Sequence, residues 1–249
     1  MINTIYIEDE IADHPRTKKL IKRFPSATII SCTRYTEIFN RKSQNFRLQK
    51  KNPALILAKK YKGMVLPTPK HYGIGAKYNY YFSHMLNCIY DCRYCFLQGM
   101  FRSAHYILFV NYEDFIDEIN STLNKHASDN VHFFSGYDCD SLALDSVSNF
   151  ISDFLPFFEN HQNALIELRT KSTQIKSLLQ RSSISNCIVA FSFTPNEIAK
   201  ALEHKTPSVS KRLEAIIELQ KVGWKIGLRF DPLIYTKTFT KEYNELFDN

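Results

Sequence analysis

Three cysteines lie within eight residues, at Cys88, Cys92 and Cys95, in the spacing C-x3-C-x2-C. Thiolate is the ligand that both iron–sulfur clusters and zinc take from cysteine. A structural zinc ion needs a fourth protein ligand to close its tetrahedron, and no fourth cysteine lies nearby in the sequence. A zinc site would therefore need a histidine such as His84, whereas three thiolates alone favour a 4Fe–4S cluster with one iron left open.

The same three cysteines have a second interpretation as core residues. On a helix, positions 88, 92 and 95 would share one face, and buried cysteine behaves as a small hydrophobic residue. Their immediate neighbours include the polar residues Asn87, Asp91 and Arg93. The pattern therefore favours metal binding over core packing.

Composition limits the class of protein. The 249 residues are 44% hydrophobic and 14% aromatic, which is typical of a globular chain of one large or two small domains. The first ten residues have neither a basic n-region nor an apolar h-region, and no run is long enough to cross a bilayer. We therefore expect a cytoplasmic protein without a membrane partner, in which clustered cysteines bind metal and do not form disulfides.

The net charge of +7 is concentrated near the N-terminus. Residues 15–62 contain fourteen Lys or Arg and a single acid, Glu37. Such a run can be a solvated face, but a segment this one-sided repels itself unless a polyanion meets it. The pattern favours contact with nucleic acid.

Two units should position these groups. Residues 1–77 are expected to form a small basic α+β unit, with strands at 28–31 and 54–58, a helix at 14–24 and a Gly/Pro-rich linker at 63–77. Residues 78–249 alternate strand and helix patterns. The expected strands are 78–87, 131–134, 164–168, 188–193 and 224–230. The expected helices begin at Asn111, cover 147–158 with a kink or end at Pro156, and run from a cap at Thr206 or Ser208 to Gly223.

Strands that alternate with helices predict a parallel sheet, and hence an α/β fold of the partial (β/α) barrel type. Working residues in such barrels lie at the carboxyl ends of the strands. Those ends carry the cysteine loop, the segment 138–141, Lys171, the segment 192–194 and Asp231. The sequence therefore predicts one site there, although helix caps also place polar residues at strand ends.

The cysteine loop after the first strand of a partial βα barrel resembles the radical S-adenosylmethionine (SAM) superfamily. Within it, the chain is most similar to the spore photoproduct lyase family. The resemblance rests on residues 92–98 (CRYCFLQ), Cys139 with Ser141, 203–208 (EHKTPS), 211–215 (KRLEA), Tyr6 with Glu8, and the basic N-terminal unit. It covers essentially all 249 residues.

The resemblance implies two cofactors, a 4Fe–4S cluster and SAM. Cys88, Cys92 and Cys95 would bind three irons, and the open iron would chelate SAM. It also implies that Tyr94 lies against the adenine. Ser141, Lys171 and Ser192 match family positions near SAM, where a cationic lysine suits a carboxylate. A reductant such as flavodoxin or ferredoxin would supply the electron.

The resemblance further implies a carbon–carbon lyase that repairs the ultraviolet-induced thymine dimer of DNA. Cys139 matches the cysteine that returns a hydrogen to the product radical, a task that suits the weak S–H bond. The basic N-terminal unit would hold the DNA phosphates. Cys139 could instead be an incidental loop cysteine, but its aspartate neighbours favour the functional role, whereas Cys32 and Cys187 follow apolar patterns and are expected in the core.

Two features depart from the family pattern. Phe96 follows the last cysteine, where the family usually has a tyrosine implicated in passing the radical back. The sequence also ends soon after the fifth strand, so the barrel is expected to be incomplete at its C-terminus. A radical SAM enzyme with a different substrate, and a non-catalytic zinc-binding nucleic-acid-binding protein, therefore remain as alternatives.

Overall fold

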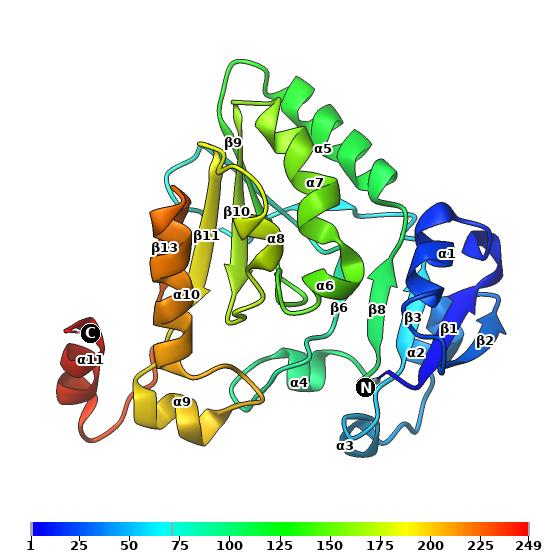
Figure 1. The fold of residues 1–249 in the computed structure, drawn as a ribbon, viewed down its shortest axis with the longest axis horizontal. Helices are drawn as coiled ribbons and strands as arrows, with labels where there is room; N and C mark the ends of the chain where they lie inside the picture. Colours follow the sequence, from blue (N-terminus) through cyan, green and yellow to red (C-terminus); the bar gives the residue numbers. More distant parts are fainter. Residues whose placement is uncertain (1, 71, 249) are drawn as a thin grey trace.

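The computed structural model describes residues 2–70 and 72–248, and its strands fall into two sheets and one separate pair (Figure 1). The strands are β1 Thr4–Glu8, β2 Thr28–Cys32, β3 Leu55–Ala58, β4 Val65–Pro67, β5 Tyr78–Phe82, β6 Met85–Leu86, β7 Asp91–Cys92, β8 Tyr106–Phe109, β9 Val131–Ser135, β10 Ala164–Thr170, β11 Cys187–Ser192, β12 Glu203–His204 and β13 Lys225–Arg229.

The helices lie mostly between successive strands. They are α1 Pro15–Ile21, α2 Tyr35–Phe39, α3 Phe46–Gln49, α4 Leu97–Met100, α5 Tyr112–Lys125, α6 Asp145–Ser148, α7 Phe150–Glu159, α8 Lys176–Leu179, α9 Asn196–Leu202, α10 Val209–Lys221 and α11 Phe239–Phe247, with one 3-10 turn at Asp9–Ile11.

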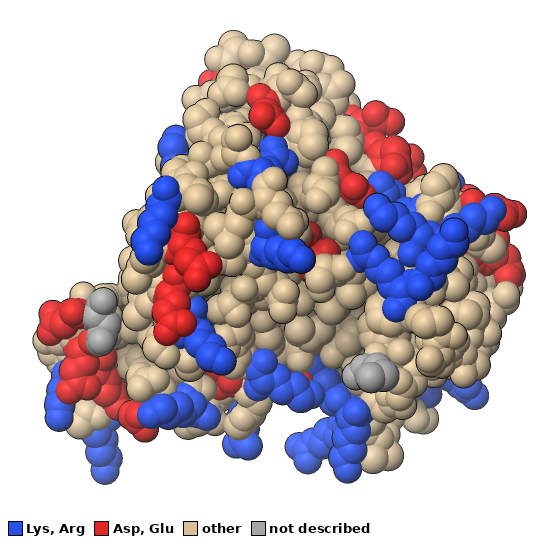
Figure 2. All heavy atoms as spheres, in the orientation of Figure 1, with Lys and Arg blue, Asp and Glu red and all other residues tan. Residues whose placement is uncertain are grey.

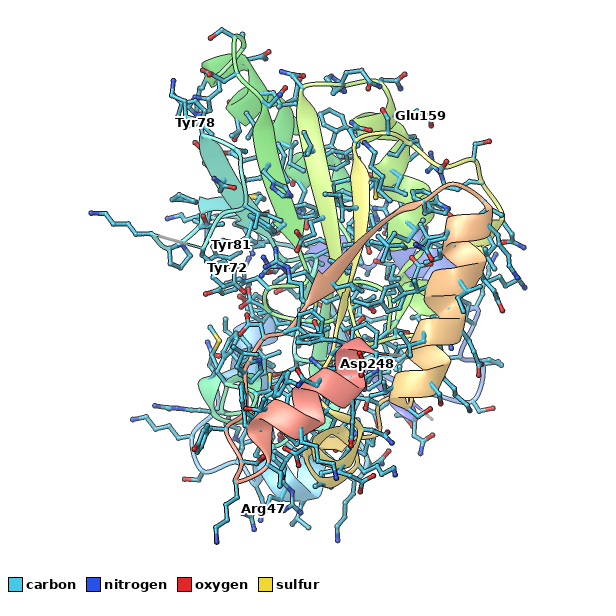
Figure 3. All side chains as sticks on the ribbon, turned by 90° about the vertical axis from the view of Figure 1, so that its left-hand side faces the viewer. Arg47, Tyr72, Tyr78, Tyr81, Glu159 and Asp248 are labelled. Carbon is cyan, nitrogen blue, oxygen red and sulfur yellow. The ribbon has the colours of Figure 1, made fainter. Side chains whose placement is uncertain are left out.

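The second sheet has the order β13-β11-β10-β9-β5-β4. Its first five strands are parallel neighbours, and only β4 is antiparallel, to β5. These five strands are the five that the sequence predicts, so the α/β class and the parallel sheet are confirmed. One face of the sheet carries apolar residues such as Phe133, Leu168 and Phe191, all buried in the main core. Figure 3 shows α10 on one side of the sheet and Tyr72 and Tyr81 on the other.

The expected strand 78–87 is two strands that belong to different sheets. β5 pairs with β9 in the second sheet, whereas β6 pairs with β8 in the first. Ser83 and His84 lie between them and are both buried, and the His84 ring stacks on Phe150 with 3.9 Å between centroids. The sequence does not reveal a change of pairing partner, because pairing is made with strands distant along the chain.

The first sheet has the order β2-β1-β3-β8-β6. The strands expected at 28–31 and 54–58 are β2 and β3, and the expected helix begins at Pro15 as α1. However, β8 and β6 come from beyond residue 77, and β4, from the expected linker, joins the second sheet. The predicted division at residue 77 therefore does not coincide with a division between the sheets.

The later helices follow the sequence with two differences. Asn111 precedes α5, but its side chain bonds the backbone of Lys60 and does not cap the helix. α7 continues through Pro156 to Glu159, and the helix break falls earlier, at Asn149, where φ is 54°. α10 is capped by Ser208, whose hydroxyl accepts from the Lys211 N–H at 3.3 Å. In the described residues no helix is long and apolar enough to span a membrane.

Candidate active site

A cavity of about 470 Å³ lies at the carboxyl ends of the strands of the second sheet. Seven of the eight site residues predicted from the sequence line it: Cys88, Cys92, Tyr94, Cys95, Cys139, Lys171 and Ser192. The eighth, Ser141, does not line it, because its side chain points into the sheet and shares a 2.6 Å hydrogen bond with the Ser135 hydroxyl. The residues predicted at the strand ends therefore come together in one cavity, as the sequence indicated.

The cysteine loop is held from both sides. Asn87 has a positive φ of 68°, and its side chain donates 2.8 Å hydrogen bonds to the carbonyls of Ser103 and His105. On the other side, β7 pairs with β12, and the Arg93 N–H donates to the Leu202 carbonyl at 2.8 Å. The loop is thus anchored to segments more than ten and more than a hundred residues further along the chain.

The three thiols share one wall of the cavity. Burial raises the pKa of Cys88, and it raises that of Cys92 to about 11 although the nearby charge of Lys171 acts in the opposite direction. Within residues 2–70 and 72–248, no three His, Cys, Asp or Glu side chains are grouped to hold one metal ion. A zinc ion needs all its ligands at about 2–2.3 Å from one point, whereas each cysteine of an iron–sulfur cluster binds its own iron. Three thiols that line one cavity are a donor set that fits an iron–sulfur cluster.

The histidine considered for zinc lies elsewhere. His84 is buried, does not line the cavity, and packs flat against Phe150. Burial lowers its pKa to about 3, so the ring is neutral at physiological pH. Its place in the core is a structural one.

Cys139 reaches the cavity from the turn after β9. The turn begins at Gly136, whose φ is +80° and where an added Cβ would lie 2.6 Å from the Ser141 hydroxyl. Cys139 is only 7% exposed but lines the cavity, and burial raises its pKa well above the usual value. The sulfur therefore keeps its hydrogen. Cys32 and Cys187 are also buried but do not line the cavity, as expected.

Asp140 fixes the turn that carries Cys139. Its carboxylate accepts hydrogen bonds from the Thr170 hydroxyl and the Lys171 N–H, both at 2.7 Å, and from two backbone N–H groups of its own turn. Burial raises its pKa although these bonds act in the opposite direction. The turn after β9 is thereby tied to the end of β10.

A buried carboxylate that sequence reasoning did not single out organises the side of the cavity near the cysteines. Glu203 pairs with Arg212, whose side chain is fully buried, and accepts a hydrogen bond from the Tyr94 hydroxyl. The Lys171 ammonium lies 3.9 Å from the same carboxylate. Two predicted site residues are thus oriented by Glu203, which the sequence marked only as part of the 203–208 motif.

A second buried carboxylate organises the opposite wall. Glu167 accepts from Arg169 Nε at 2.7 Å and from Arg229 Nε and Nη2 at 2.7 and 2.8 Å, and both arginines line the cavity. Burial alone would raise the pKa of Glu167, but the two guanidinium groups lower it. The available sequence signal was a charged residue in the middle of the apolar run of β10.

Aromatic side chains surround the outer part of the cavity. Phe96 lines it and is 54% exposed, and its ring lies 6.0 Å from that of Tyr137. Tyr137 in turn contacts Tyr81 at 4.3 Å and Tyr72 at 5.7 Å between centroids. Figure 3 shows Tyr72 and Tyr81 close together beside the sheet. Aromatic rings of this kind can stack on nucleobases.

Comparison with known proteins gives a consistent result. A family model described as spore photoproduct lyase matches residues 1–249. The spore photoproduct lyase of Bacillus subtilis (strain 168) is 22% identical over 249 residues, which are 98% of this chain and 71% of that protein. The enzyme of the same name from Clostridium acetobutylicum is 24% identical over 169 residues, 68% of this chain and 50% of that protein.

Solved structures share the fold. A spore photoproduct lyase complexed with dinucleoside spore photoproduct superimposes with a TM-score of 0.86 at 20% identity, over 100% of this chain and 73% of that one. A mutant of spore photoproduct lyase with bound AdoMet and dinucleoside spore photoproduct gives a TM-score of 0.87 at 19% identity, over the same shares of the two chains.

Proposed function

The chain belongs to the spore photoproduct lyase family, and from this premise we propose that it is a radical SAM enzyme that repairs the ultraviolet-induced thymine dimer of DNA. The observation that carries the proposal is the meeting of Cys88, Cys92, Cys95 and Cys139 in one cavity. The first three suit a cluster, and the fourth comes from a different strand end.

Each group of residues has a proposed task. Cys88, Cys92 and Cys95 would hold a 4Fe–4S cluster, which together with SAM supplies a 5′-deoxyadenosyl radical by one-electron cleavage. Tyr94, Lys171 and Ser192 would contact SAM, and Glu203 would orient the first two through its hydrogen bond to Tyr94 and its proximity to Lys171. Ser141, which lies behind the wall, would support the turn of Cys139.

Cys139 is the proposed hydrogen donor. Its thiol is buried and protonated, so it presents an S–H bond to the cavity. Transfer of that hydrogen atom to the carbon-centred product radical would form a C–H bond and leave a sulfur radical.

The partners follow from the same premise. Damaged DNA is the proposed substrate, and the N-terminal unit is proposed to contact its phosphates. The proposed reductant is an acidic carrier such as flavodoxin or ferredoxin. All six cysteines are free in the described residues, which suits the reducing cytoplasm that we propose as its compartment.

Anaerobic reconstitution with iron and sulfide tests the proposal. The brown protein should bind about four irons and convert SAM to 5′-deoxyadenosine under reductant. With dinucleotide spore photoproduct, wild type should release intact thymine pairs, and Cys139→Ala should cleave SAM but release far fewer. A colourless protein with one zinc and no SAM cleavage would refute the radical chemistry.

One observation favours a second candidate, radical SAM chemistry on another substrate. Phe96 lines the cavity and offers no hydroxyl where the family usually has a tyrosine. If wild type and Cys139→Ala both cleave SAM but neither releases intact thymine pairs, this candidate replaces repair of the lesion.

A further inference from the structure

Four segments meet on the outer side of the cysteine loop. Gln49 Oε1, at the end of α3, accepts hydrogen bonds from the Ala104 N–H at 2.8 Å and the Ser103 hydroxyl at 3.2 Å. Lys50 Nζ donates to the Cys88 carbonyl at 3.0 Å and pairs with Asp91 at 2.8 Å. Residues 46–51, 88–93, 101–104 and 202–205 therefore form one continuous surface, which Lys205 closes by pairing with Asp91 at 2.6 Å.

This surface is strongly basic. Its cations, here called the loop-side patch, are Arg47, Lys50, Lys51, Arg93, Arg102 and Lys205. The four segments contain only two acids, Asp91 and Glu203, and Glu203 is buried against Arg212. Figure 2 shows Lys and Arg gathered along the lower edge of the molecule, around α3 and α4.

The loop-side patch is separate from the cavity. None of its six cations is among the described residues that line the cavity, although the cysteine side chains are. The backbone of the loop therefore stands between the patch and the thiols. Figure 3 places Arg47 at the lower end of the molecule, well away from Tyr72 and Tyr81 at the aromatic part of the cavity.

We propose that the loop-side patch docks an acidic one-electron carrier protein, which reduces the cluster through the back of the cysteine loop. The inference rests on the proposed function. In the step, one electron leaves the reduced carrier and enters the cluster; no bond forms or breaks.

Residues 46–51 belong to the N-terminal unit proposed to contact DNA, but two arguments favour the carrier over DNA as the partner of this part of it. Electron transfer weakens steeply with distance, so the carrier must approach where the cluster is nearest the surface, and a substrate in the cavity blocks the other side. The distance here is short, because the side chain of a single residue, Lys50, reaches from this surface to the Cys88 carbonyl. DNA, by contrast, must present its damaged bases to the cavity, whose aromatic residues Tyr72 and Tyr81 lie well away from Arg47. Opposite charges also steer weak electron-transfer encounters without a large interface.

The test measures carrier binding directly. Oxidised flavodoxin is titrated into the protein without its cluster, and binding is followed by flavin fluorescence at low salt. Arg47→Glu/Lys51→Glu should weaken binding about tenfold or more, because both side chains are exposed and the reversal repels an acidic partner. The matched control is Lys19→Glu/Lys22→Glu on and beside α1, which should change binding by less than about twofold. Rising salt should weaken wild-type binding in the same titration.

The second readout is the rate of SAM cleavage with two reductants. The double variant should lose activity about tenfold with reduced flavodoxin and keep it with dithionite, which needs no docking surface. Unchanged flavodoxin binding in the variant, or salt-independent binding in wild type, would overturn the proposal. So would a variant that loses affinity for DNA but not for flavodoxin. Failure of wild type to cleave SAM with dithionite would count against the proposed function instead, and the binding titration would still decide on the patch.

Discussion

Two buried carboxylates, one in the first sheet and one beside the strand ends of the second, are used differently. In the first sheet, Glu8 ends β1 and is fully buried; its two oxygens accept from the N–H groups of Tyr35 at 2.7 Å and Lys59 at 2.8 Å. Glu203 lies in β12 of the separate strand pair, accepts from Thr194 just after β11, and binds the side chains of Arg212 and Tyr94. One carboxylate closes loops, and the other positions groups that line a cavity.

The difference shows how to distinguish structural from functional polar residues at strand ends. The Glu8 carboxylate accepts a backbone amide on each oxygen and so replaces missing ladder bonds. Its one cationic partner, Arg34 at 3.7 Å, does not line the cavity. Glu203 and Glu167 instead hold Tyr94, Lys171, Arg169 and Arg229, whose side chains line the cavity. Polar strand ends therefore mark a candidate site where the partners of the buried group line a cavity.

The largest expected effect is that of Glu203→Gln. The change leaves the buried Arg212 guanidinium without a counter-charge, which should lower the free energy of unfolding by about 3–5 kcal/mol. Urea denaturation measures it. Glu203→Gln/Arg212→Met should recover part of the loss, because the unpaired charge is removed. A loss below about 1 kcal/mol would mean that the pair is not buried as described.

Glu8→Gln is the matched change in the first sheet. The amide oxygen can still accept one backbone N–H, but the amide nitrogen is a donor and faces the second N–H without forming a bond. We therefore expect the free energy of unfolding to fall by about 1–3 kcal/mol. SAM cleavage by the folded variant should stay at the wild-type rate. A drop in that rate would break the comparison, because it would connect Glu8 to the site.

His84, at the junction of the two sheets, should make the protein sensitive to acid. Burial lowers its folded-state pKa to about 3 from an ordinary 6.5. The unfolded chain therefore binds a proton first, so this contribution to stability is complete above pH 6.5 and is lost as the pH falls toward 3. Between pH 7 and 5.5 the expected loss from this group is about 1 kcal/mol. Denaturation of wild type and His84→Phe at both pH values should show a smaller drop in the variant, and equal drops would contradict the assignment.

Phe96→Tyr should have the smallest effect on stability, within about 0.5 kcal/mol, because the ring is 54% exposed. Its effect should appear in the chemistry instead. If a phenol at this position helps to return the radical, fewer molecules of 5′-deoxyadenosine should form per repaired dimer than in wild type. Chromatography of both products measures the ratio, with Phe96→Leu as the control for ring removal. An unchanged ratio would mean that the residue at position 96 takes no part in returning the radical.

Much of the second sheet was predictable from the sequence. Five runs in alternation with helical patterns predicted β5, β9, β10, β11 and β13. Of the eight site residues predicted near the ends of these strands, seven line the cavity. The roles of those residues remain proposals. The strand β8 was missed, and the place of β6 in the first sheet was not predictable, because a short strand carries no mark of the distant strand with which it pairs.

The basic N-terminal segment shows a further limit. Arg16 pairs with Glu113 and Asp153, and Lys59 pairs with Glu10, so part of the charge holds the fold together. A count of charges does not distinguish such pairs from a surface that meets a partner. Only the folded chain shows which cations lie around the cysteine loop.

The sequence by itself determined the chemistry: three closely spaced thiols, a fourth cysteine in a polar turn, and strands whose ends bring them to one edge. Spacing and periodicity are local properties, so they can be read from neighbouring residues. The tertiary structure decided which buried carboxylates serve the site, that Ser141 lies behind its wall, and that the outer side of the loop is basic. These depend on contacts between residues tens to more than a hundred positions apart, such as Lys205 with Asp91 or Glu203 with Tyr94, and such distances follow only from the folded chain.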